Sequence, residues 1–137
     1  MSYEILEHTA DEKFRATGKD LDEAFSEAVN AFSEIVGGGG GEYHHKVEIE
    51  SENLEALLFD FMDELIFLQD SEGVLVSHSK DLTVEETEDG HRLTATILVD
   101  PITSDTRGLD IKGPTYSEMK VDYEKGEGWV IETVLDV

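Results

Sequence analysis

The four residues His8-Thr9-Ala10-Asp11 bring together side chains that could bind a metal ion or move a proton. They lie between two short runs that read as strands, where a tight turn would ordinarily carry Gly or Asn. A purely structural role is the simpler interpretation, because Thr and Asp side chains often hydrogen-bond the local backbone and shape a connection. A chemical role would be a site for a hard cation, whose preferred ligands are oxygen atoms.

The C-terminus offers a complement to this segment. The chain ends Leu135-Asp136-Val137, and these residues close a run that is predicted to form a strand. If that strand pairs near the N-terminal strands, Asp136 and the terminal carboxylate could face Asp11. Three converging anionic groups would repel one another unless a cation lay among them. The cation site and the structural interpretation both remain open at this point.

Other patterns typical of catalysis are weak or missing in this sequence. Without Cys, the chain has no disulfide, no thiolate metal site and no cysteine nucleophile. Its histidines do not form the i, i+4 pair of a zinc protease, and no Gly-x-Ser-x-Gly elbow is present. The run Gly37–Gly41 lacks the Gly-Lys-Ser/Thr ending of a phosphate-binding loop, so it is predicted to be a flexible linker.

Acidic residues dominate the composition. The chain has 33 Asp and Glu against 10 Lys and Arg, a formal net charge of −23. Direct binding of nucleic acid is disfavoured, because phosphate contacts need Lys and Arg. The acids are spread along the whole chain and show no phosphate-like spacing, which argues against a nucleic-acid mimic. In about 1 M salt the Debye length falls to ~3 Å and repulsion between surface charges largely disappears, so we expect a protein from a salt-accumulating halophile.

The length of 137 residues suits a single domain over residues 1–137. The N-terminus has no basic stretch followed by an apolar one, as a signal peptide would. No apolar run approaches the ~20 residues that are needed to span a bilayer. We therefore expect a soluble, cytoplasmic protein with no membrane contact.

Two helices and a series of strands must position the candidate residues. Asp20 is predicted to cap a helix over 21–35, and Asn53 a second helix over 54–68, because apolar residues recur there at helical spacing. Strands are predicted over 3–6, 14–17, 47–50, 74–77, 82–87, 93–99, 119–123 and 129–135. Two helices followed by a strand-rich half predict an α+β fold, with both helices packed on one face of a mostly antiparallel sheet.

Five blocks of the sequence resemble the archease family, in order and over nearly the whole chain. The stretch YEILEHTAD resembles the family's opening, and KDLDEAF and NLEALL resemble its two helix starts. The stretch DIKGPTY at 110–116 resembles a late family motif, and the final LDV resembles its close. Ser117 and Pro114 depart from the usual pattern. The resemblance implies an α+β domain with a strand-helix-strand-strand module, as the periodicity also indicates.

The resemblance also implies a function that composition does not show. Archeases act as protein cofactors of the RtcB-type tRNA-splicing ligase, which joins RNA ends bearing a 2′,3′-cyclic phosphate or 3′-phosphate to a 5′-hydroxyl. That ligase first guanylylates its own active-site histidine, using GTP and manganese. By resemblance, this chain would promote guanylylation and multiple turnover without being an enzyme itself. It would meet RNA only through the ligase.

Family members carry a divalent-cation site at positions that correspond here to Asp11, Asp136 and Val137. Calcium suits an all-oxygen site best, with magnesium and manganese as alternatives. His8 and Thr9 are predicted to orient the segment by hydrogen bonds, because imidazole suits softer metals than these oxygens do.

Two alternative functions come from other classes. The first is a small metal-dependent hydrolase, in which Asp11 and Asp136 hold a metal-bound water and His8 serves as general base. The second is a chaperone-like modulator of RNA-processing proteins. No long exposed apolar stretch in the sequence favours this second alternative.

Overall fold

The computed structural model describes residues 2–6, 11–103 and 111–137. His8, Thr9 and most of the expected polar loop over 101–108 lie outside the described residues. Seven strands and two helices follow one another along these described residues: β1 (Ser2–Leu6), β2 (Glu12–Gly18), α1 (Leu21–Val36), β3 (Tyr43–Ser51), α2 (Leu54–Glu72), β4 (Val74–Glu86), β5 (His91–Pro101), β6 (Gly113–Glu124) and β7 (Gly128–Asp136).

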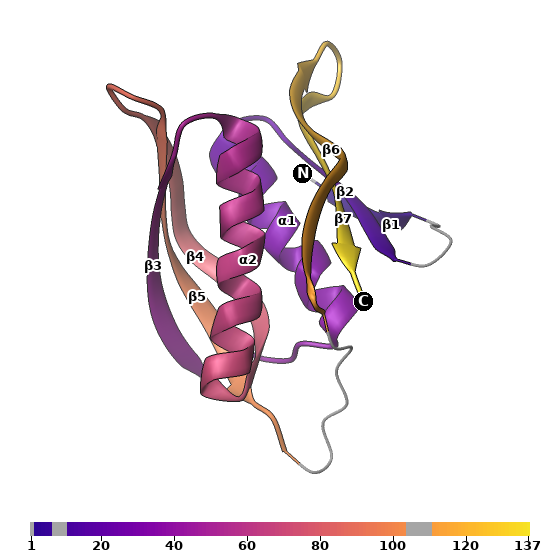
Figure 1. Cartoon of the computed structure of the whole chain (residues 1–137), viewed down its shortest axis with the longest axis vertical. Helices are drawn as coiled ribbons and strands as arrows, with labels where there is room; N and C mark the ends of the chain where they lie inside the picture. The colour runs from indigo at the N-terminus through magenta and orange to yellow at the C-terminus, as the bar shows by residue number, and fades with distance from the viewer. Residues whose placement is uncertain (1, 7–10, 104–110) are drawn as a thin grey trace.

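The strands form two antiparallel sheets that enclose both helices. The four-stranded sheet has the order β1-β2-β7-β6, and the three-stranded sheet has the order β3-β5-β4. Figure 1 shows α1 and α2 between these sheets. The predicted α+β class is confirmed, including a strand-helix-strand-strand module formed by β3, α2, β4 and β5. The strands divide over two sheets where the sequence analysis expected one, since pairing partners far apart in sequence leave no local signal.

Both helices begin at the predicted residues, whereas α1 ends one residue and α2 four residues later than predicted, each at the next glycine. The Asp20 carboxylate accepts a hydrogen bond from the Glu23 N–H at 2.9 Å, and the Asn53 side chain accepts one from the Ala56 N–H at 2.8 Å. These caps satisfy backbone donors that have no partner within the helix. Each helix stops at a glycine in the left-handed conformation, Gly37 with φ 82° and Gly73 with φ 65°, which a side chain would disfavour.

One continuous core lies between the sheets. The predicted apolar positions of α1 and α2 are buried or half-buried, and four phenylalanines are fully buried among them or on β2: Phe14, Phe25, Phe32 and Phe61. Asp60, Asp63 and Glu64 are exposed on α2, as predicted. Within the described residues, neither helix is long and apolar enough to cross a membrane.

The glycine run after α1 is bound to the three-stranded sheet, so its interpretation as a flexible linker is wrong. The Asp100 carboxylate accepts hydrogen bonds from the N–H groups of Gly41 at 2.8 Å and Glu42 at 3.0 Å. The Ser77 hydroxyl donates to the Gly39 carbonyl. A Cβ on Gly38 would lie 1.9 Å from the Val76 carbonyl oxygen. Small residues are needed here because the loop backbone lies directly against β4 and β5.

Candidate functional site

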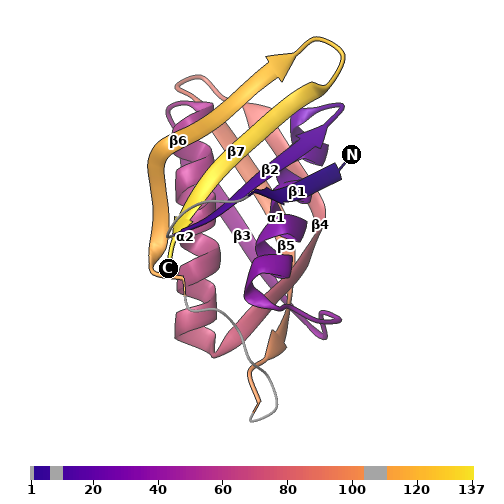
Figure 2. The same ribbon diagram turned by 90° about the vertical axis from the view of Figure 1, so that its right-hand side faces the viewer.

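The last strand joins the two ends of the sequence. β7 lies between β2 and β6, as Figure 2 shows looking onto the four-stranded sheet. Its register pairs Leu135 with Glu12 on one side and Asp136 with Gly113 on the other. Continuing the β2–β7 register by one residue places Asp11 opposite Asp136. The C-terminal strand therefore pairs with β2, the second of the two N-terminal strands, which is the arrangement that the predicted cation site requires.

Asp11 and Asp136 line one pocket at the end of this sheet. The pocket has a volume of ≈ 280 Å³, and its wall consists of Asp11, Lys112, Gly113, Pro114, Thr115, Ser117, Val134 and Asp136. Two carboxylates and two hydroxyls are a donor set of hard oxygens, which suits calcium, magnesium or manganese. Lys112 is the one base among the described residues that line the pocket, so two carboxylates face one ammonium-bearing side chain there and a bound cation would balance the remaining negative charge.

Val137 is placed differently from the two aspartates. Its side chain is half-buried and packs against the hydrophobic core, and it is not among the residues that line the pocket. The Lys112 N–H donates to the Asp136 carbonyl at 2.8 Å, which holds the chain end against the start of β6. The backbone that leads into Val137 is thus tied to Lys112 of the pocket wall.

The described residues hold no group of three or more His, Asp or Glu side chains that could bind a metal. The pocket supplies two carboxylates, from Asp11 and Asp136. The segment just before Asp11, with His8 and Thr9, lies outside the described residues. The structure therefore brings together two of the three residues predicted for the site.

An irregularity in β6 shapes the opposite wall of the pocket. The β6–β7 register shifts between Thr115 and Lys120, and Glu118 within this bulge has φ 60°. The Thr115 hydroxyl accepts a hydrogen bond from the Ser117 N–H at 3.1 Å, which closes a local turn. Non-glycine residues adopt a positive φ only where surrounding contacts hold them. The bulge turns Ser117 towards the same pocket as the aspartates.

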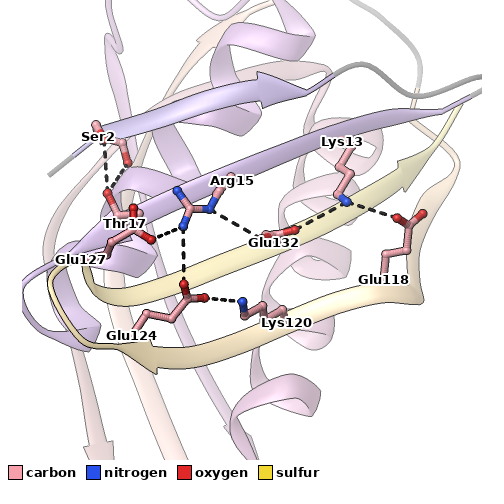
Figure 3. A network of polar contacts seen from close by, with 9 residues as sticks. All are labelled: Ser2, Lys13, Arg15, Thr17, Glu118, Lys120, Glu124, Glu127 and Glu132. Carbon is pink, nitrogen blue, oxygen red and sulfur yellow. Dashed lines mark hydrogen bonds and ion pairs between the residues drawn. The ribbon is translucent and has the colours of Figure 1, made fainter.

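Lys13 joins this bulge to the centre of the sheet. Its ammonium lies 3.2 Å from the Glu118 carboxylate and 3.5 Å from that of Glu132 (Figure 3). The hydrogen bond with Glu118 is the main reason why the pKa of Lys13 is raised. Lys13 is therefore engaged with β6 and β7 on the same face of the sheet as the pocket.

Arg15 extends the same network along the sheet. Its guanidinium contacts Glu127 of the β6–β7 hairpin and lies 3.8 Å from Glu124 and 3.6 Å from Glu132 (Figure 3). The hydrogen bond with Glu127 is the largest cause of the raised pKa of Arg15. Lys120 in turn binds Glu124. This outer network ties together the three strands that support the pocket.

Sequence reasoning found the two carboxylates and missed the rest of the wall. Lys112, Thr115 and Ser117 line the pocket but were not predicted as site residues. The first two stand in the late motif at 110–116, which carried part of the family resemblance, and that motif was the available signal. The bulge that brings Ser117 inward has no signature in the sequence.

The protein is thus a small α+β domain in which two helices lie between antiparallel sheets. Asp11, just before β2, and Asp136, at the end of β7, line one pocket of this domain. Residues 3–137 match the Archease protein family (MTH1598/TM1083). The chain belongs to the archease family. It is 35% identical to a protein archease of Pyrococcus abyssi, over 98% of each chain. It is 33% identical to one of Pyrobaculum neutrophilum, over 98% of this chain and 95% of the relative.

Two solved structures share the fold. The solution structure of Methanobacterium thermoautotrophicum protein 1598 matches with a TM-score of 0.83 and 31% identity, over 98% of both chains. The crystal structure of an archease from Thermotoga maritima, described as a possible chaperone, matches with a TM-score of 0.64 and 21% identity, over 96% of this chain and 94% of that one. The second likeness is evidence for the fold alone.

Proposed function

We propose that this chain is a non-catalytic protein cofactor of an RtcB-type RNA ligase in tRNA splicing. It promotes guanylylation of the ligase and allows repeated turnover. The observation that carries the proposal is the pocket in which Asp11 and Asp136 meet, in a member of the archease family. The formal net charge of −23 supports contact with RNA through the ligase rather than directly. The protein would act in the cytoplasm, without membrane contact.

In this proposal the pocket holds a divalent cation by the carboxylates of Asp11 and Asp136 and by the terminal carboxylate of Val137. The donor set supports this assignment, because carboxylate oxygens are preferred by calcium, and magnesium and manganese also accept them. A cation bound here would neutralise the two facing carboxylates and supply positive charge at the surface. The two aspartates would position the ion, and Lys112 forms part of the pocket wall beside it.

The proposal is tested by adding the purified protein to the ligase of the same organism and following guanylylation and multiple-turnover ligation. The Asp11→Ala variant should lose activation while its circular dichroism and melting stay close to wild type. Asp11 precedes β2, so its loss removes a ligand and at most a local hydrogen bond, worth about 1 kcal/mol. Asp122→Ala, which removes an exposed acid of β6, is the matched control and should activate normally. Full activation by Asp11→Ala would contradict the metal-centred part of the proposal.

A second arm measures cation binding without the ligase. Two residues appended after Val137 convert the terminal carboxylate to an amide and move the charge ~7 Å along an extended chain. Calorimetric titration with calcium and with manganese should then show weaker binding, as should Asp136→Asn, whereas a tag at the N-terminus should do less harm. Equal binding by both tagged forms would remove Val137 from the site. Turnover of nucleotides or phosphoesters by the isolated protein would instead favour a hydrolase.

A further inference from the structure

One phenylalanine stands apart from the others in this protein. Phe67 on α2 is 54% exposed, whereas the other five phenylalanines are buried or half-buried. Two turns earlier on the same helix, the ring of Phe59 is covered by Tyr116 of β6, with ring centroids 4.3 Å apart and planes 4° from parallel. Among the described residues, no aromatic ring covers Phe67 in this way. Of the two phenylalanines of α2 that are not buried in the core, Phe59 is therefore covered by a ring and Phe67 is not.

Phe67 lies in a groove between the C-terminal half of α2 and the start of β6. The groove has a volume of ≈ 440 Å³ and is lined by Asp63, Ile66, Phe67, Asp70, Ser71 and Lys112. Its apolar lining comes from Phe67 and from Ile66, which is almost completely buried. An apolar floor with polar walls is typical of a site that accepts a side chain from another molecule.

The charges around the groove restrict what can bind there. Asp63 and Asp70 stand four residues before and three residues after Phe67, so all three lie on one face of the helix. A second copy of this chain would bring more carboxylates to the groove, given a formal net charge of −23. A segment with an apolar side chain flanked by Arg or Lys would place its bases against both aspartates. Charge complementarity therefore favours a basic, amphipathic partner segment.

The groove borders the pocket of Asp11 and Asp136 at Lys112, which lines both. Lys112 is the one base among the described residues that line the groove, and it stands at the border with that pocket. Basic residues of the partner should therefore meet Asp63 and Asp70 and avoid the Lys112 end. A protein bound in the groove would therefore reach the edge of the carboxylate pocket at Lys112.

We infer that the α2–β6 groove docks a basic, amphipathic segment of the protein partner, whose apolar side chain packs on Phe67. Resting on the proposed function, this partner is the RNA ligase, and the groove holds it with the carboxylate pocket facing its reaction centre. The groove contributes affinity and orientation, whereas Asp11 and Asp136 contribute the cation.

The test uses two probes on the full chain. The first is a fluorescein-labelled helical peptide with one leucine flanked at three and four residues by arginines, together with a copy in which serine replaces the leucine. The second is the ligase of the same organism. Fluorescence anisotropy with the peptide and sedimentation with the ligase should both show that Phe67→Ser weakens binding about tenfold or more. The double variant Asp63→Asn/Asp70→Asn should weaken binding less. The loss for Phe67→Ser should persist at high salt, because apolar contact is not screened.

Matched controls separate the groove from general acidity. Tyr123→Ser removes an aromatic side chain that is 61% exposed near the β6–β7 hairpin, and Asp89→Asn/Asp122→Asn removes two exposed acids elsewhere. Both should bind each probe like wild type, and the serine peptide should bind more weakly than the leucine peptide. Equal binding of both peptides, or equal effects of Phe67→Ser and Tyr123→Ser, would overturn the docking site. So would a wild-type dimer that Phe67→Ser converts to a monomer.

The two proposals fail in different ways. If Phe67→Ser weakens binding of the leucine peptide but wild type neither binds nor activates the ligase, the groove stands and the ligase is not the partner. If wild type activates the ligase and Phe67→Ser binds and activates equally well, the proposed function stands and the groove is rejected.

Discussion

On the outer face of the four-stranded sheet, the ion-paired side chains of Arg15 and Glu132 are 23% and 21% exposed. On the outer face of the three-stranded sheet, the pair Arg92 and Glu50 is 38% and 58% exposed. Both faces look away from the helices and both carry acid–base pairs. The ion pair on the four-stranded sheet is therefore the less exposed of the two.

The two outer faces differ in the apolar residues that lie beneath their charged side chains. β7 buries apolar residues on both sides: Ile131 and Leu135 join the main core, while Val130 and Val134 are buried outside it on the outer face. The aliphatic parts of Lys and Arg can cover such positions while their charged ends pair at the surface. On the three-stranded sheet, the central strand β5 places Thr94 and Thr96 outward and half-buried, and only Leu98, beside Gly41 of the glycine loop, is a buried apolar residue among the described outward positions of this strand. The four-stranded sheet, which carries the pocket, is thus packed with apolar residues on both faces of β7.

The largest expected effect comes from removing an apolar residue beneath the network. Val130→Ala should lower the free energy of unfolding by about 2 kcal/mol, because it removes buried methyl groups and leaves a cavity. Thr96→Ala, the control on the other sheet, should change it by about 0.5 kcal/mol or less, as surface substitutions do. Denaturant unfolding of both variants measures the difference. Equal losses would show that the two outer faces are energetically alike.

A smaller effect is expected from breaking the charge network itself. Glu132→Gln should cost about 1–2 kcal/mol, because Lys13 and Arg15 would lose a shared carboxylate in a partly buried setting. Glu50→Gln should leave stability unchanged within error, since its pair with Arg92 is more exposed. The comparison should be made in dilute buffer and in concentrated KCl, where the exposed pair is screened first. A larger loss for Glu50→Gln would reverse the ranking of the two faces.

The smallest effect concerns pH. Lys120 lowers the pKa of Glu124 by a hydrogen bond, and Glu124 raises that of Lys120 in return. The contribution of Glu124 is present above its ordinary pKa of 4.5 and is lost as the pH falls through its lowered value. That of Lys120 is present below its ordinary pKa of 10.5 and is lost as the pH rises through its raised value. Both contributions are therefore constant between these limits.

Lys120→Met should consequently reduce the loss of stability on acidification below pH 4.5 and leave the shape of the profile between the two limits as in wild type. Lys125→Met, in the exposed hairpin, should follow the wild-type profile. Thermal melting across the acidic range, with carbon-detected NMR titration of the Glu124 carboxyl, measures both. An unchanged titration of Glu124 in Lys120→Met would show that this pair is not formed in solution.

The expectation of a halophilic source bears on the same network. A charge of −23 should make the chain more stable as KCl is added, since repulsion over the surface is screened. The ion pairs of the outer network are close contacts that salt screens less. Undiminished stability in dilute buffer would count against salt adaptation.

By itself, the sequence determined the local structure and pointed to half of the site. Asp20 and Asn53 cap their helices, and the apolar spacing of both helices marks the faces that are buried, because these features depend on neighbours within a few residues. The unusual cluster ending in Asp11 and the acid next to the C-terminus could likewise be singled out without coordinates. The resemblance to the archease family, which the match over residues 3–137 confirms, assigned Asp11 and Asp136 to one predicted site.

Only the tertiary structure decided which of these pieces meet. The placement of β7 between β2 and β6, the split into two sheets and the bulge at Glu118 all depend on pairings between residues far apart in the chain. A short alternating segment carries the same pattern whichever strand it joins, so register is set by packing of the whole sheet. The wall of Lys112, Thr115 and Ser117 beside the aspartates, and the uncovered Phe67 next to it, follow from that packing.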